Sequence, residues 1–174
     1  MVTAPGDLAL VERFVNTIDF EKATDAIATP RDLGRWAREH GAGGSFTRAD
    51  TERVLAFREA LRALLLAHHG EPADAAAVDV LRRESARAPL VVAFGEDGGA
   101  SLAPAGRGTD ALLGRLLAAV ARAEAEGTWE RMKACPADDC LWAFYDHSRN
   151  RSRTWCSMAV CGNRAKARSY RARS

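Results

Sequence analysis

The chain has 174 residues, and all four of its cysteines lie in the last 40 of them. Cys135, Cys140, Cys156 and Cys161 follow the pattern C-x4-C-x15-C-x4-C, in which two equally spaced pairs are separated by a loop. Four thiolates at such spacing can fill a tetrahedral zinc shell and leave no open position for catalysis. The pattern therefore predicts a structural zinc site, with an iron–sulfur cluster or a redox-active disulfide pair as the alternatives.

The segment that carries the second cysteine pair is also strongly basic. It has no acidic residue from position 149 onward, and its eight cations are Arg149, Arg151, Arg153, Arg164, Lys166, Arg168, Arg171 and Arg173. Four thiolates on zinc carry a formal charge of about −2, which Arg164 could offset from one helical turn beyond Cys161. The remaining cations exceed that need and suit phosphate contacts, so the pattern predicts DNA binding. A solvated or protein-facing basic surface is the alternative.

Charge and composition divide the chain in two. Residues 1–130 hold 15 Lys and Arg against 20 Asp and Glu, whereas residues 131–174 hold 10 against 3. With 47% hydrophobic and 28% charged residues, the chain can form an ordinary globular core. We place the boundary near Gly127, which predicts an N-terminal domain over 1–127 and a zinc finger over 128–174. We find no export signal or membrane span and expect a cytoplasmic protein.

Apolar periodicity and capping residues predict the elements of the N-terminal domain. Helices are expected from Leu8 to about Ile18 behind Asp7, from Pro30 to His40 behind Thr29, and from Thr47 to Gly70. Further helices are expected over 73–86 and, behind Thr109, up to Gly127. Residues 90–94 and 101–103 read as the strands of one hairpin.

Within the finger, residues 141–145 read as a strand, 146–150 as a turn and 153–155 as the returning strand. Ser157 is expected to cap a helix whose first turns carry Cys161. Trp129, Trp142, Phe144 and Trp155 are expected to supply the small core and the contact to the main domain. The sequence thus predicts an α+β protein: a mainly helical domain with one β-hairpin, followed by a treble-clef-like zinc finger with four cysteine ligands.

The residues Cys161-Gly162-Asn163-Arg164 resemble the signature of the CGNR zinc-finger proteins. The similarity extends over Cys135-Pro136-Ala137-Asp138-Asp139-Cys140, Phe144-Tyr145-Asp146, Ser148-Arg149-Asn150, Trp155-Cys156-Ser157-Met158, Lys166, Arg168 and Tyr170-Arg171. The N-terminal part resembles the ABATE domain that precedes this finger, through Phe14-Val15-Asn16-Thr17 and Arg58-Glu59-Ala60-Leu61-Arg62. The resemblance implies zinc on the four cysteines and a role in transcription regulation linked to stress.

Asn16 and Arg58 are polar groups on otherwise apolar helix faces, so they are candidates for binding an effector. The alternative is a buried hydrogen-bonded pair that fixes helix packing. We find no phosphate loop, nucleophile motif or histidine–carboxylate cluster and expect no enzyme activity.

We therefore predict a zinc-binding transcription regulator whose finger contacts DNA and whose N-terminal domain senses a ligand or partner protein. Because one finger reads few base pairs, a homodimer is also considered. A zinc module that binds only protein is the principal alternative, and a thiol-redox enzyme is the third.

Overall fold

The computed structural model describes residues 2–172, which fold into six α-helices and three two-stranded antiparallel sheets. The helices are α1 (Leu8–Val15), α2 (Pro30–Glu39), α3 (Arg48–Ala67), α4 (Ala75–Arg87), α5 (Gly108–Ala125) and α6 (Asn163–Arg171). The strands are β1 (Ile18–Asp19), β2 (Thr24–Asp25), β3 (Leu90–Phe94), β4 (Ala100–Pro104), β5 (Met132–Ala134) and β6 (Ala143–Tyr145). A 3-10 turn, η1 (Trp129–Arg131), precedes β5, and a π-helical turn, η2 (Met158–Gly162), leads into α6. The α+β fold class is confirmed.

Capping residues explain where several helices begin. The hydroxyl of Thr29 accepts a hydrogen bond from the Asp32 amide, and Thr47 and Asp50 form a reciprocal capping box at the start of α3. Asp7 makes no such bond, so its expected capping role is wrong. The expected cap at Thr109 is wrong too, because α5 begins at Gly108 and the Thr109 hydroxyl donates to Asp50 Oδ1 at 2.9 Å.

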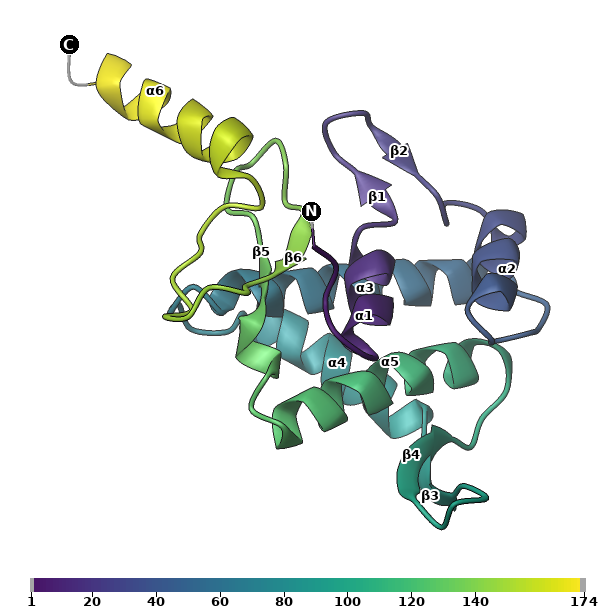
Figure 1. Ribbon diagram of the computed structural model, residues 1–174. Coiled ribbons are helices and arrows are strands. Elements are labelled where there is room, and N and C mark those ends of the chain that lie inside the picture. Colours follow the sequence, from purple (N-terminus) through teal and green to yellow (C-terminus); the bar gives the residue numbers. More distant parts are fainter. Residues whose placement is uncertain (1, 173–174) are drawn as a thin grey trace.

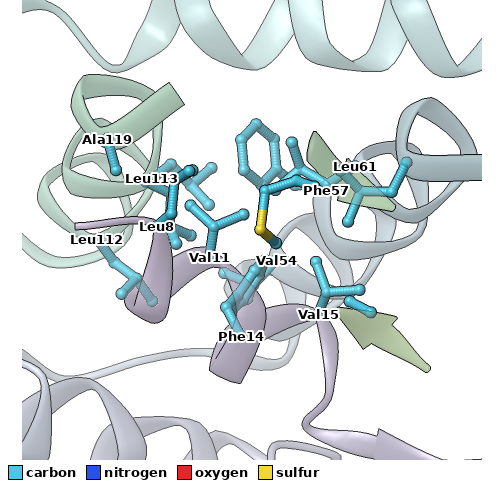
Figure 2. Packing of buried hydrophobic residues seen from close by; sticks show 14 of the residues in the cluster. Leu8, Val11, Phe14, Val15, Val54, Phe57, Leu61, Leu112, Leu113 and Ala119 are labelled. Atoms are coloured by element: carbon cyan, nitrogen blue, oxygen red, sulfur yellow. The ribbon is translucent and has the colours of Figure 1, made fainter. Parts of the chain in front are cut away.

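The main core lies where α1, α3 and α5 meet (Figure 1). Its side chains recur at three- and four-residue steps along each helix, which places them on one face. Figure 2 shows Val11 and Phe14 of α1 between Val54 and Phe57 of α3 and the leucines of α5. Phe14 and Phe57 are fully buried, and their ring centroids lie 6.3 Å apart.

The finger shares this core instead of forming only its own. Met132 and Ala134 of β5 and Ala143 and Tyr145 of β6 all belong to the main cluster, together with Trp129. A second, smaller cluster surrounds the cysteines and contains Phe144, with Trp142 and Trp155 packed against it. The strands of the finger therefore pack on both sides, toward the helices and toward the cysteines.

The strand pairing in the finger differs from the expected one. β6 pairs with β5, with Lys133 opposite Phe144, while residues 153–155 form no strand. The Arg153 guanidinium turns back to the carbonyls of Trp155 and Cys156, and its amide donates to Asp146. Those bonds use the polar groups that a returning strand would need, so the predicted 153–155 strand is wrong.

The β1–β2 pair was not expected either, whereas β3 and β4 form the predicted hairpin. Within the described residues, no helix combines the length and apolar character that crossing a membrane requires.

Candidate metal centre and basic surface

The four cysteines come from two places in the fold and meet at one point. Cys135 and Cys140 lie in the connection between β5 and β6, while Cys156 precedes η2 and Cys161 lies within it. All four sulfur atoms lie within 4.8 Å of one another, and the Sγ atoms of Cys140 and Cys156 are 3.5 Å apart. No disulfide joins them. The structure thus brings all four predicted ligands together.

The spacing of the sulfur atoms fits a tetrahedral metal. Zinc–sulfur bonds of about 2.3 Å place the corners of a tetrahedron ~3.8 Å apart, and the Cys156–Cys161 separation is 3.7 Å. Burial of three of the four residues excludes a water ligand from most directions. The residues therefore fit a closed structural zinc site, in which the ion would cross-link the β5–β6 connection to the start of the terminal helix.

The pKa values of the thiols show which of them must lose a proton before a metal ion can bind. A hydrogen bond donated by Cys156 lowers the pKa of Cys135 to about 5, whereas burial raises the pKa of Cys140 to about 11. The pKa of Cys156 is also raised, because its proton is held by Cys135. Without metal, Cys135 is thus favoured as a thiolate beside the protonated thiols of Cys140 and Cys156. A divalent cation would stabilise the other thiolates as well.

Arg164 lies against this cluster. Its Nη2 is 3.4 Å from Cys161 Sγ, and its Nη1 is 3.1 Å from Asp139 and 3.4 Å from Glu21. The contact with Cys161 raises the pKa of Arg164. This placement suits compensation of the thiolate charge, and it leaves Arg164 less free to reach a phosphate.

A buried ion pair shapes the loop of residues 146–153. Asp146 is fully buried and accepts hydrogen bonds from Lys133 Nζ at 2.9 Å and from the amides of Ser148 and Arg153. Burial alone would raise the pKa of Asp146, but the bonds from Ser148 and Lys133 outweigh it and lower the pKa to about 2. Lys133 Nζ also donates to the carbonyl oxygens of Arg151 and Arg153. The pair thereby fixes the backbone that carries the loop arginines.

The predicted phosphate-binding cations fall into two groups. Arg151, Arg153 and Arg164 bind acids, carbonyls or sulfur within the chain, and the Arg153 guanidinium also lies over the Phe144 ring. A second group is exposed and has no acidic partner among residues 2–172: Arg149, Lys166, Arg168 and Arg171. Arg173 lies outside the described residues.

Asn16 and Arg58, the candidate effector residues, both bind within the chain. The Asn16 amide exchanges two hydrogen bonds with the main chain of Ala143, at 2.9 and 2.7 Å. Arg58 is buried and binds Asp25, Glu59 and the Thr17 hydroxyl. The two side chains thus lie at one junction, linked through Thr17, which follows Asn16 in the chain.

Sequence reasoning missed the other groups at this junction. Arg62 donates to the carbonyls of Val15 and Leu141, both at 2.6 Å. His68 and His69, at the end of α3, bond to the carbonyls of Met132 and Ala134. Their partners are main-chain atoms far away in the sequence, so no local residue pattern signals them.

Comparison with known protein families agrees with this architecture. Residues 8–126, more than half of the chain, match the family described as "Putative stress-induced transcription regulator" (ABATE). The chain belongs to the ABATE family. Residues 131–174 of this ABATE protein match the CGNR zinc finger, and the four cysteines lie within that match. No curated protein matches the chain.

Proposed function

We propose that this ABATE protein is a zinc-dependent regulator that binds duplex DNA through α6 and the loop of residues 146–153. The observation that carries the proposal is the character of α6. This helix buries none of its side chains, carries Lys166, Arg168 and Arg171, and projects away from the rest of the molecule (Figure 1).

A helix of nine residues that is polar all round gains little stability from packing. Its surface instead suits a polyanion, because the major groove of DNA admits an α-helix and its walls are lined with phosphates. Zinc on Cys161 would hold the first turn of this helix against the knuckle of Cys135 and Cys140. The metal would therefore position the cations without touching the DNA.

The salt dependence of binding follows from the cations that are free. If Arg149, Lys166, Arg168 and Arg171 each neutralise one phosphate, the slope of log K against log salt is about −3.6. Affinity then falls by roughly 10²-fold between 50 and 200 mM salt. If Arg151, Arg153 and Arg164 also bound phosphate, the same change of salt would cost nearly 10⁴-fold.

Fluorescence anisotropy of zinc-loaded, full-length protein on mixed-sequence duplex DNA tests this proposal. Replacing Lys166, Arg168 and Arg171 by Gln should weaken binding at least tenfold and flatten the salt slope by about 3. A matched control replaces Arg13, Arg31 and Arg38, which are exposed helical cations of the N-terminal domain, and should bind as the wild type does. Equal binding by both triple variants, or no binding at low salt, would instead favour a finger that binds only protein.

We further propose that binding of an effector or a partner protein to the N-terminal domain changes how the finger binds DNA. The support is the junction itself, where Arg58 holds Thr17 and the neighbouring Asn16 holds the main chain of β6. A ligand that takes over the bonds of Arg58 would displace Thr17 and Asn16. The main chain of β6 and the cysteine loop next to it would then move as well. Asn16→Ala, which removes no charge, should therefore change DNA affinity several-fold at full zinc content; unchanged affinity contradicts the link.

A further inference from the structure

The β3–β4 hairpin presents an apolar surface that nothing in the described residues covers. β4 packs against α5, and the hairpin lies at the side of the molecule away from β5, β6 and α6 (Figure 1). Phe94 is 75% exposed and Val92 62%, and Val91 and Leu102 are exposed as well. Large apolar side chains gathered on one exposed element are typical of an interaction surface.

The outer edge of this hairpin is open for pairing. β3 has β4 as its sole strand neighbour in the described part of the chain, and its sequence Leu-Val-Val-Ala-Phe contains no charge, proline or glycine. Proteins usually protect such an edge with a charge, a proline or a covering segment. None of these devices is present on β3, which predicts that another strand covers it.

The register of the hairpin shows which backbone groups of β3 can bond to a further strand. The amide of Gly95 bonds to Gly99, and the amide of Ala105 bonds to Pro89, so the odd-numbered residues of β3 bond toward β4. Antiparallel ladders alternate, and therefore Leu90, Val92 and Phe94 direct their amides and carbonyls to the open edge.

This edge is complementary to itself. When two copies meet antiparallel about a two-fold axis at Val92, each Val92 lies opposite the other and each Leu90 lies opposite a Phe94. Every outward-facing residue then forms a hydrogen-bonded pair, and the two hairpins become one four-stranded sheet. An isologous contact of this kind needs no surface other than β3 itself.

The charges beside the strand fit the same register. In this antiparallel arrangement the acidic turn of one copy, with Glu96 and Asp97, lies toward the start of β3 in the other copy, where α4 ends in Arg87. Both acids are exposed, and neither has an ion-pair partner among residues 2–172. Arg87 and Arg83, at the end of α4, are also exposed, and the one acid near them is Glu84, at 4.0 and 3.8 Å. One alignment therefore matches both the apolar edge and the charges at its two ends.

We propose that a second copy of this chain binds along β3, forming a two-fold dimer with a continuous four-stranded sheet. Such a dimer requires no DNA, and its test contains none. A strand from a different protein could use the same edge, but the pairing of the acidic turn with Arg87 specifically favours a second copy.

Sedimentation of full-length, zinc-loaded protein across a dilution series tests the dimer. The wild type should shift reversibly between dimer and monomer. Val92→Lys, which sets two cations opposite each other at the centre, should weaken association by at least about 10²-fold. Since Val92 is largely exposed, the Val92→Lys protein should keep the circular dichroism spectrum and the thermal midpoint of the wild type. A wild-type monomer at every concentration, or a Val92→Lys protein that still dimerises, would overturn the proposal.

A charge exchange tests the register. Arg87→Glu and Glu96→Lys should each weaken the dimer about tenfold, because each change counts twice across the two-fold axis. The double variant should recover most of that loss, whereas Arg38→Glu on α2 should leave association unchanged. Additive weakening in the double variant would show that these charges do not meet and would contradict the register.

Discussion

At the scale of single residues, the buried pair of Lys133 and Asp146 holds the loop of residues 146–153 in the finger. Asp146→Asn keeps an acceptor but leaves the Lys133 ammonium buried without a counter-charge, which typically costs about 3 to 5 kcal/mol. We expect urea unfolding of the zinc-loaded variant to show a loss of this size. Asp138→Asn makes the same chemical change at an exposed site of the finger and should cost less than about 0.5 kcal/mol.

The lowered pKa of Asp146 sets the pH range over which this stabilisation is lost. Because that pKa is lowered to about 2, the stabilisation is complete above the ordinary value of 3.8 and is lost only as the pH falls toward 2. The difference in unfolding free energy between wild type and Asp146→Asn should therefore be the same at pH 7 and pH 6. If this difference became smaller between pH 7 and pH 6, a group other than Asp146 would account for most of the stabilisation.

At the scale of elements, the end of α3 holds β5 through an uncharged histidine. Burial lowers the pKa of His68, whose Nδ1 donates to the Met132 carbonyl at 2.6 Å. The unfolded chain takes up a proton below about pH 6.5 that the folded state resists, so stability present above that pH is lost as the pH falls.

Between pH 7.5 and 5.5 the wild type should therefore lose up to about 1.4 kcal/mol more stability than His68→Asn, whose amide nitrogen takes the place of Nδ1 and can donate the same bond without titrating. Chemical unfolding at both pH values measures this difference. His147→Asn makes the same change at an exposed position and leaves His68 in place, so the pH-dependent loss assigned to His68 should remain.

The elements also show what sequence can predict. Thr29, Thr47 and Ser157 mark helix starts through bonds three residues away, and local signals predicted these three caps, although not the cap that Asp74 forms on α4. The metal site was equally predictable, because cysteine spacing is local and thiolate chemistry is specific. The β5–β6 pairing was not, since Lys133 in the middle of a short strand looks exposed until Asp146 is placed beside it.

The same limit applies to the basic segment. Its charge was evident from sequence, but which cations are free depends on the folded backbone. Arg153 and Arg164 are bound within the chain, whereas Arg168 is exposed on α6. Asn16 likewise looked like a free polar group on an apolar face. Its partner, the main chain of Ala143, lies 127 residues away, and a main-chain partner leaves no trace in residue type.

At the scale of the whole molecule, the helical domain and the finger share one core. Trp129, Met132 and Tyr145 are buried among residues of the helices, and Arg62 bonds to carbonyls on both sides of the junction. Removing residues after Gly127 would therefore expose the core of the part that remains. Variants of the full chain are the sounder way to separate the roles of the two parts.

A shared core also predicts how the protein responds to loss of metal. Chelation of zinc would free the cysteine loop and η2, and the resulting disorder of β5 and β6 would uncover the main core. We expect a single cooperative unfolding transition, seen alike by helical circular dichroism and tryptophan fluorescence, whose midpoint falls by more than about 10 °C on chelation. Cys140→Ser should show the lowered midpoint without chelator and no further change with it. Two separate transitions, with that of the helices unmoved by chelator, would mean that the finger folds as an independent unit despite the contacts it makes with α1 and α3.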